Sequence, residues 1–221
     1  MRLPLKTPPG HKLSRALSAA LFGTLFAASF VMQEALAQSA PASSAFAALE
    51  MVRQRQDNGG RPFMLIDKRD ARLWLFDGQA RTVANTAILL GQAIGDDTVP
   101  GIGDRPLSQV EPHERTTPAG RFVAELGRNG EGEEVIWVDY DAAVSIHRVR
   151  ARVAAQRRLE RLASATPSDN RVSWGCINVP VAFFERYLLP LVADKPVGQR
   201  PLVYVLPETR PLQTLFSSLR P

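Results

Sequence analysis

Short runs of alternating apolar and polar residues, separated by turn signals, constrain the fold of this chain most strongly. Such alternation is typical of strands that bury one face. Asp77-Gly78 lies between two of these runs and is a dipeptide typical of hairpin turns. The expected strands are 63–66, 72–76, 82–90, 121–126, 134–138, 143–147 and 202–206. The sequence therefore predicts a mainly β domain, a sandwich or barrel with a few short helices.

The segment before these strands has a different composition. Residues 1–37 begin with four Lys and Arg side chains, continue with an apolar run over 16–32, and end at the small-x-small site Ala35-Leu36-Ala37. This order is typical of a cleaved signal peptide, and an uncleaved membrane anchor is the alternative. We expect an exported protein with no stable membrane span after cleavage.

The remaining chain divides by composition into three parts. Residues 38–60 are expected to contain a short helix over 45–56 that serves as a spacer or as a packing helix at the domain edge, and residues 61–207 are expected to form the β domain. Residues 208–221 are expected to be a C-terminal tail. Without residues 1–37 the net charge falls from +5 to +2, from 23 Lys and Arg against 21 Asp and Glu. This small excess does not indicate a nucleic-acid partner.

Cys176 is the only cysteine in the chain. It has no partner for an intramolecular disulfide, and an unpaired thiol outside the cytoplasm is a liability unless it has a function. Gly175 permits a tight backbone before it, and Pro180 suits the first turn of a following helix, whose dipole would lower the pKa of the thiol. A small buried apolar side chain is the alternative role. Export favours the role of nucleophile.

A cysteine nucleophile needs a neighbouring base or a lowered pKa. Two histidines remain after removal of the signal peptide, His113 and His147. His113 lies in a polar loop, where a solvated histidine is the default. His147 ends a predicted strand, so it is the better candidate. One cysteine and two histidines do not form a dense ligand cluster, so no metal site is expected.

The segment between His147 and Cys176 is strongly basic, and the sequence predicts a helix over 148–165. Its arginines are Arg148, Arg150, Arg152, Arg157, Arg158 and Arg161. They form either a solvated basic face or a lid whose guanidiniums meet substrate carboxylates. Arg148 and Arg171 are the candidate substrate contacts of such a lid.

Three elements together resemble the catalytic domain of the L,D-transpeptidases (YkuD-type), a family of exported bacterial cell-wall enzymes. They are Ser173-Trp174-Gly175-Cys176-Ile177-Asn178, the strand-borne His147 before it, and Thr117-Pro118-Ala119-Gly120-Arg121-Phe122. The resemblance covers roughly Pro62 to Pro207 and implies a mostly β fold in the periplasm.

The resemblance also implies roles for individual residues. Cys176 would be the nucleophile and His147 the general base. Gly175 and the backbone N–H of Cys176 would shape an oxyanion pocket, while Ser173 and Asn178 would hold the loop and the substrate.

Two features depart from the family pattern. Trp174 stands where the family usually has a histidine, so any help from that histidine to substrate or oxyanion is missing or replaced. The spacer over 148–172 is longer than usual, at 25 residues. Both departures are expected to affect which substrate the protein prefers more than the reaction at Cys176.

The implied reaction is acyl transfer through a Cys176 thioester, from a stem-peptide L,D bond of peptidoglycan to an amine in the cell wall. Stem peptides would be the partners, carbapenem-type inhibitors would acylate Cys176, and no metal or organic cofactor is needed. Hydrolysis of the same bonds by a carboxypeptidase or endopeptidase is one alternative. A non-catalytic wall-binding module is another.

Overall fold

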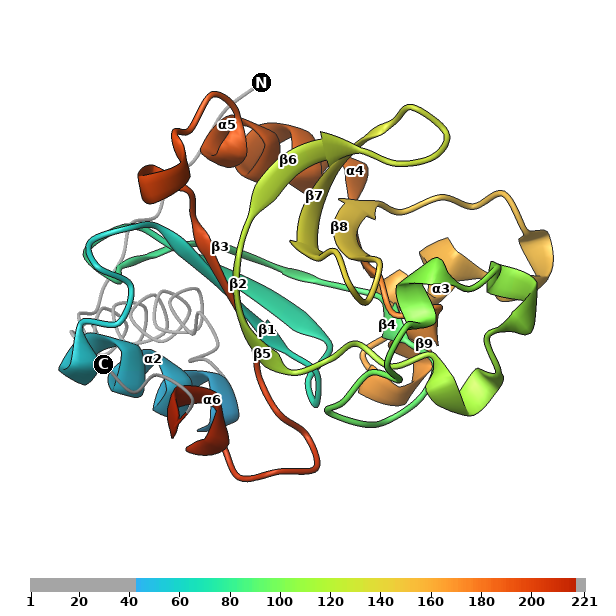
Figure 1. Cartoon of the computed structure of the whole chain (residues 1–221), viewed down its shortest axis with the longest axis horizontal. Coiled ribbons are helices and arrows are strands. Elements are labelled where there is room, and N and C mark those ends of the chain that lie inside the picture. The colour runs from blue at the N-terminus through green and yellow to red at the C-terminus, as the bar shows by residue number, and fades with distance from the viewer. Residues whose placement is uncertain (1–42, 218–221) are drawn as a thin grey trace, which may run out of the picture. The chain divides into compact units, whose positions relative to one another are not determined.

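The computed structural model describes residues 43–217 (Figure 1). The predicted signal peptide and residues 218–221 of the predicted tail lie outside the described residues. Strands dominate the described part and its helices are short, so the predicted mainly β fold is confirmed. No helix within 43–217 combines the length and the apolar character that crossing a membrane requires.

The largest sheet has five strands in the order β3-β2-β1-β11-β5. Their bounds are β1 Phe63–Asp67, β2 Arg72–Phe76, β3 Thr82–Ala87, β5 Gly120–Val123 and β11 Leu202–Val205. The central pair β1 and β11 is parallel and the other pairs are antiparallel. The predicted turn at Asp77-Gly78 joins β2 to β3, and the N–H of Asp77 closes it on the carbonyl of Arg81 at 3.0 Å.

A second sheet has four strands in the order β10-β8-β7-β6, and β4 and β9 form a small third sheet (Figure 1). Their bounds are β4 Leu90–Gly91, β6 Glu125–Arg128, β7 Glu134–Asp139, β8 Val144–Arg148, β9 Arg171–Ser173 and β10 Ile177–Val179. The strand predicted over 121–126 is interrupted at Ala124, and its two halves belong to different sheets. The chain passes there from the first sheet to the second.

The helical elements are short and lie between or beside the sheets. The helices are α2 Ser43–Arg55, α3 Arg158–Ala163, α4 Val181–Phe183, α5 Leu189–Val192 and α6 Thr214–Ser217, with a π-helical turn at Phe184–Leu188 between α4 and α5. Single 3-10 turns cover Ile102–Asp104, Leu107–Gln109, Pro112–Glu114, Ala154–Gln156, Pro167–Asn170 and Val197–Gln199. Three of these turns lie in the long loop between β4 and β5, where the sequence is rich in Gly and Pro.

Both faces of β1 are covered, which explains why its apolar residues form a continuous run. Met64 and Ile66 belong to the core that includes residues of the second sheet. Phe63 and Leu65 point to the opposite face, where they pack with residues of α2 and α6. Figure 1 shows these two helices together beside the five-stranded sheet. The helix predicted over 45–56 is therefore a packing helix rather than a free spacer.

The basic helix predicted between His147 and Cys176 is present, but it covers only Arg158–Ala163 of the predicted range 148–165. Arg148 still belongs to β8, where it pairs in register with Val179 of β10. Residues 149–153 have no regular structure, and α-helix begins only at Arg158. The reason is tertiary: Arg150 and Arg152 form ion pairs with Glu131 and Glu133 across the turn between β6 and β7. These long-range pairs override a weak helical periodicity.

Candidate active site

Two parallel strands bring the cysteine and the histidine together. His147 lies on β8, directly opposite Asn178 of β10, and Cys176 is the residue that precedes β10. The neighbouring pair Ile146 and Ile177 is fully buried in the core. Because side chains alternate along a strand, His147 and Asn178 point to the other face. A register set by core packing thus delivers the polar side chains to one place.

The Cys176 thiol lies partly exposed among polar groups of β8. Its Sγ is 3.5 Å from the carbonyl oxygen of Ala143, to which it donates, and 3.7 Å from Oγ of Ser145. Burial raises the pKa of Cys176, but hydrogen bonding and charge interaction with His147, together with Ser145, outweigh burial and lower the pKa below its ordinary value. The arrangement favours the thiolate, which is the nucleophilic form.

The histidine shows the complementary shift. Burial lowers the pKa of His147, but its interaction with Cys176 is stronger and the net pKa lies above the ordinary value. A lowered thiol pKa and a raised imidazole pKa are the shifts expected of two groups whose charged forms stabilise each other.

The helix dipole invoked from the sequence does not act on this thiol. The three residues of β10 separate Cys176 from α4, which begins at Val181. Three extended residues span about 10 Å, and the dipole effect fades within the first helical turn. The lowered pKa comes instead from the histidine and serine of β8.

Hydrogen bonds fix which nitrogen of His147 faces the thiol. Nδ1 lies 2.9 Å from the carbonyl oxygen of Arg148, which can only accept, so Nδ1 carries a proton. Nε2 lies 3.3 Å from Nδ2 of Asn178. Nε2 is therefore the unprotonated, basic nitrogen of the ring, and the amide nitrogen of Asn178 donates to it.

The orientation of the Asn178 amide is fixed in turn by an arginine. Nη1 of Arg158 donates to Oδ1 of Asn178 at 2.5 Å. Since a guanidinium has no acceptor, the amide oxygen must face Arg158 and the amide nitrogen must face His147. Asn178 is fully buried, so this orientation is held without solvent.

The loop before Cys176 is held by two side chains, those of Ser173 and Thr117. Oγ of Ser173 donates to the carbonyl of Cys176 at 2.6 Å and accepts from the N–H of Gly175 at 3.2 Å. Gly175 has φ +127°, and a Cβ there would lie 2.7 Å from the carbonyl oxygen of Thr116. Oγ1 of Thr117 donates to the carbonyl of Gly175 at 2.8 Å. Only glycine fits this close approach.

A buried lysine that the sequence analysis did not single out supports this loop. Nζ of Lys68, whose side chain is 0% exposed, donates to the carbonyl of Thr117 and to Oδ1 of Asp96, both at 2.9 Å. Burial raises the pKa of Asp96, but hydrogen bonds from Thr209, Glu208 and Lys68 outweigh it and hold the pKa far below its ordinary value. The ion pair therefore anchors Thr117, which anchors Gly175. The sequence offers no signal for it, because its members are 28 positions apart.

The cysteine opens into a cavity of about 360 Å³. Its lining residues are Leu107, Asn129, Glu131, His147, Arg150, Arg152, Val153, Gln156, Arg158, Ser173, Trp174, Cys176 and Asn178. The predicted catalytic and substrate residues belong to this lining or, in the case of Gly175, to the loop beside it. The exceptions are Arg148 and Arg171. Trp174 lies at the wall with the guanidinium of Arg115 stacked 3.6 Å from its ring centre.

The two arginines predicted as lid contacts are engaged elsewhere. The Arg148 guanidinium pairs with Glu185 at 2.5 Å and lies over the ring of Phe184, so only the main-chain carbonyl of Arg148 serves the site. Arg171 pairs with Glu208 and donates to the carbonyl of Lys68. Neither side chain lines the cavity. The cavity is lined instead by Arg150, Arg152 and Arg158.

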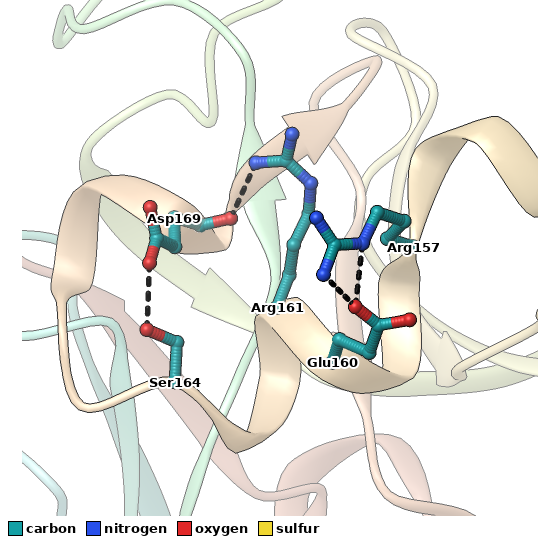
Figure 2. A pocket seen from close by; sticks show the side chains of 5 residues that line it. All are labelled: Arg157, Glu160, Arg161, Ser164 and Asp169. Atoms are coloured by element: carbon teal, nitrogen blue, oxygen red, sulfur yellow. Dashed lines mark hydrogen bonds and ion pairs between the residues drawn. The ribbon is translucent and has the colours of Figure 1, made fainter.

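Other arginines of the basic segment face a neighbouring hollow. Figure 2 shows Arg157 paired with Glu160, and Arg161 donating to the carbonyl of Asp169. This hollow holds neither His147 nor Cys176. His113, the rejected candidate base, is exposed in the 3-10 turn at Pro112–Glu114. Among residues 43–217 no three His, Cys, Asp or Glu side chains are grouped as a metal site would need.

Comparison with solved structures finds distant matches. The chain is similar to the catalytic domain of an Enterococcus faecium L,D-transpeptidase, at 18% identity and a TM-score of 0.37, over 66% of this chain and 98% of that domain. It is similar to the helical cell shape determining protein Pgp2 of Campylobacter jejuni, at 15% identity and a TM-score of 0.42, over 68% and 49%. Bd1075 of Bdellovibrio bacteriovorus matches at 12% identity and a TM-score of 0.39, over 67% and 48%.

The Enterococcus faecium match is an L,D-transpeptidase, which is the family that the sequence motifs resemble. Pgp2 is described as a cell shape determining protein. The matched part spans about half the length of Pgp2 and of Bd1075. No protein-family model and no curated protein matches the chain. With TM-scores below 0.5, the likeness carries no inference about what this chain does.

Proposed function

We propose that the protein is a cysteine-dependent L,D-transpeptidase that acts on peptidoglycan stem peptides in the periplasm. One observation carries the proposal: the pKa of the only cysteine is lowered by a histidine whose other ring nitrogen is held by a carbonyl, and both line one cavity. A thiol, a base and a group that orients the base are the parts that nucleophilic catalysis needs.

The first half-reaction forms a thioester. Nε2 of His147 takes the thiol proton, and Sγ of Cys176 attacks the carbonyl carbon of the L,D bond. The backbone N–H of Cys176 is the donor proposed for the oxyanion, because the N–H of Gly175 is bonded to Ser173. The C–N bond then breaks, and the imidazolium returns its proton to the departing amine.

The second half-reaction releases the acyl group. An amine of a neighbouring stem attacks the thioester, His147 takes the proton that the amine loses, and the thiolate leaves. Water in place of the amine gives hydrolysis. The machinery at Cys176 serves both outcomes, so the acceptor decides between a transferase and a carboxypeptidase or endopeptidase.

The charge of the cavity fits an anionic peptide. Three arginines and one glutamate line it, and Glu133 pairs with two of these arginines, which leaves one cation in excess with His147 neutral. Stem peptides carry free carboxylates. A non-catalytic wall-binding module would also suit this charge, but such a module has no need of a thiol coupled to an oriented histidine.

Product analysis on purified muropeptides tests the proposal. We expect new cross-linked dimers together with a released terminal D-amino acid, and neither product from Cys176→Ala. Shortened stems without dimers would instead establish hydrolysis. A Cys176→Ala variant that binds sacculi and forms the same products as the unaltered protein would refute catalysis by this thiol.

A further inference from the structure

The three arginines in the wall of the cavity differ in how their charges are balanced. Arg150 pairs with Glu131 at 2.6 Å and also with Glu133. Arg152 pairs with the same two carboxylates, at 2.7 and 3.2 Å. Arg158 has only neutral partners among the described residues: Oε1 of Gln156 at 2.7 Å and Oδ1 of Asn178 at 2.5 Å.

The Arg158 guanidinium is therefore a half-buried cation without a carboxylate beside it. Burial lowers the pKa of Arg158, and interaction with the Cys176 thiolate acts in the opposite direction. An arginine remains protonated in proteins, so it does not lose its charge to relieve this burial. Its two neutral bonds use Nε and one N–H of Nη1, which leaves N–H groups of the planar fork for an anion.

Its position places that anion next to the reacting sulfur. The charge of Arg158 acts on both Cys176 and His147, and all three residues line the same cavity. In a peptide whose last residue departs, the terminal carboxylate is three bonds from the carbonyl carbon under attack. A cation beside the nucleophile is suited to hold that group.

We propose that Arg158 is a carboxylate subsite, which binds the terminal carboxylate of the amino acid that leaves when Cys176 attacks. The identity of the peptide rests on the proposed function, but anion binding beside the thiol does not. The subsite makes the protein selective for bonds to a C-terminal residue over bonds within a longer chain. Selectivity arises because an amide or a further residue cannot form the charge-assisted pair.

A pair of alkylating reagents tests the subsite without any assumption about the natural reaction. Iodoacetate and iodoacetamide both react by attack of the thiolate on the CH₂ carbon with loss of iodide, but only iodoacetate carries a carboxylate. The rate of each is measured on the full chain at low salt by intact mass. We expect Arg158→Gln to lower the iodoacetate-to-iodoacetamide rate ratio on the order of tenfold, the size of one charge-assisted hydrogen bond.

Two further variants separate charge from structure. Arg158→Lys keeps the cation and should retain most of the ratio. Arg157→Gln removes an equal charge from the adjacent position, which faces the hollow of Figure 2, and should leave the ratio unchanged. An unchanged ratio in Arg158→Gln, or equal slowing with both reagents, would overturn the subsite and leave Arg158 only a support for Asn178.

A second arm separates this proposal from the proposed function. A stem tetrapeptide is offered with a free C-terminal acid and with a C-terminal amide, and the preference for the acid should be lost in Arg158→Gln. An equal preference in both proteins would overturn the subsite while the transpeptidase proposal stands. If the alkylation ratio depends on Arg158 but neither peptide reacts, the subsite stands and the proposed function fails.

Discussion

At the scale of single residues, the site is a chain of hydrogen bonds in which each member fixes the next. Arg158 sets the orientation of the Asn178 amide, the amide nitrogen faces Nε2 of His147, and the Arg148 carbonyl holds Nδ1. The result is an imidazole with one defined nitrogen for the thiol of Cys176. The sequence predicted the cysteine and the histidine, because a single cysteine behind a predicted signal peptide and a scarcity of histidines are visible in it.

The coupling of Cys176 to His147 predicts an unusual pH dependence of thiol reactivity. The lowered pKa of Cys176 means that the thiolate persists below the pH at which an ordinary thiol, with a pKa of about 8.5, is protonated. The raised pKa of His147 means that the imidazolium persists above the ordinary histidine range. Each shift therefore extends the pH range over which its group is charged.

Alkylation by iodoacetamide as a function of pH measures this range for Cys176. We expect the inflection of the unaltered protein to lie below about 8.5, the pKa of an ordinary thiol. In His147→Ala the inflection should move upward, because burial then raises the pKa of the thiol without opposition from the imidazole. An inflection that does not move would show that the histidine leaves the thiol unaffected.

At the scale of elements, the sequence predicted the strands that a local pattern encodes. It missed the elements whose structure depends on contacts with distant residues. The strands predicted over 63–66, 72–76 and 143–147 are present to within one residue, because apolar runs of this length match strands that are buried along most of their length. β9 and β10 were not predicted, since three residues are too short for a visible period. The basic segment is mostly not helical, because carboxylates from the turn between β6 and β7 hold its arginines.

The buried pair of Lys68 and Asp96 is also a contact between distant positions, which the sequence does not reveal. We expect its removal to lower the stability of the protein. In Lys68→Met the buried Asp96 carboxylate would lose its nearest cation and keep only Arg210 at 3.8 Å, and Glu208 would lose the same lysine, which costs about 3–5 kcal/mol of the free energy of unfolding. The carbonyl of Thr117 would lose a donor, so the loop at Gly175 should loosen and alkylation of Cys176 should change as well. Denaturant unfolding measures the first effect.

The exposed pair of Arg81 and Asp77 supplies the matched control. The Arg81 side chain is 76% exposed, so Arg81→Met should alter the free energy of unfolding by less than about 1 kcal/mol. Equal effects of the two substitutions would contradict the role given to the buried lysine.

At the scale of the whole molecule, one strand, β1, organises the described part of the chain. The second sheet packs toward one face of β1, and α2 and α6 cover the other. The second sheet in turn holds β8 and β10 in the register that joins His147 to Asn178. The mainly β fold was predictable from periodicity, but which sheet each strand joins was not. No turn residue over 121–126 marks the break at Ala124, where the chain passes from one sheet to the other.

The central claim is that Cys176, activated by His147, forms an acyl-enzyme. The most direct measurement is the intact mass of the full chain after incubation with a carbapenem, whose strained amide acylates such thiols. We predict one adduct on the unaltered protein, a much slower adduct on His147→Ala, and none on Cys176→Ala. An unmodified mass after an incubation that fully acylates an active L,D-transpeptidase would contradict the account, as would an equal adduct on Cys176→Ala.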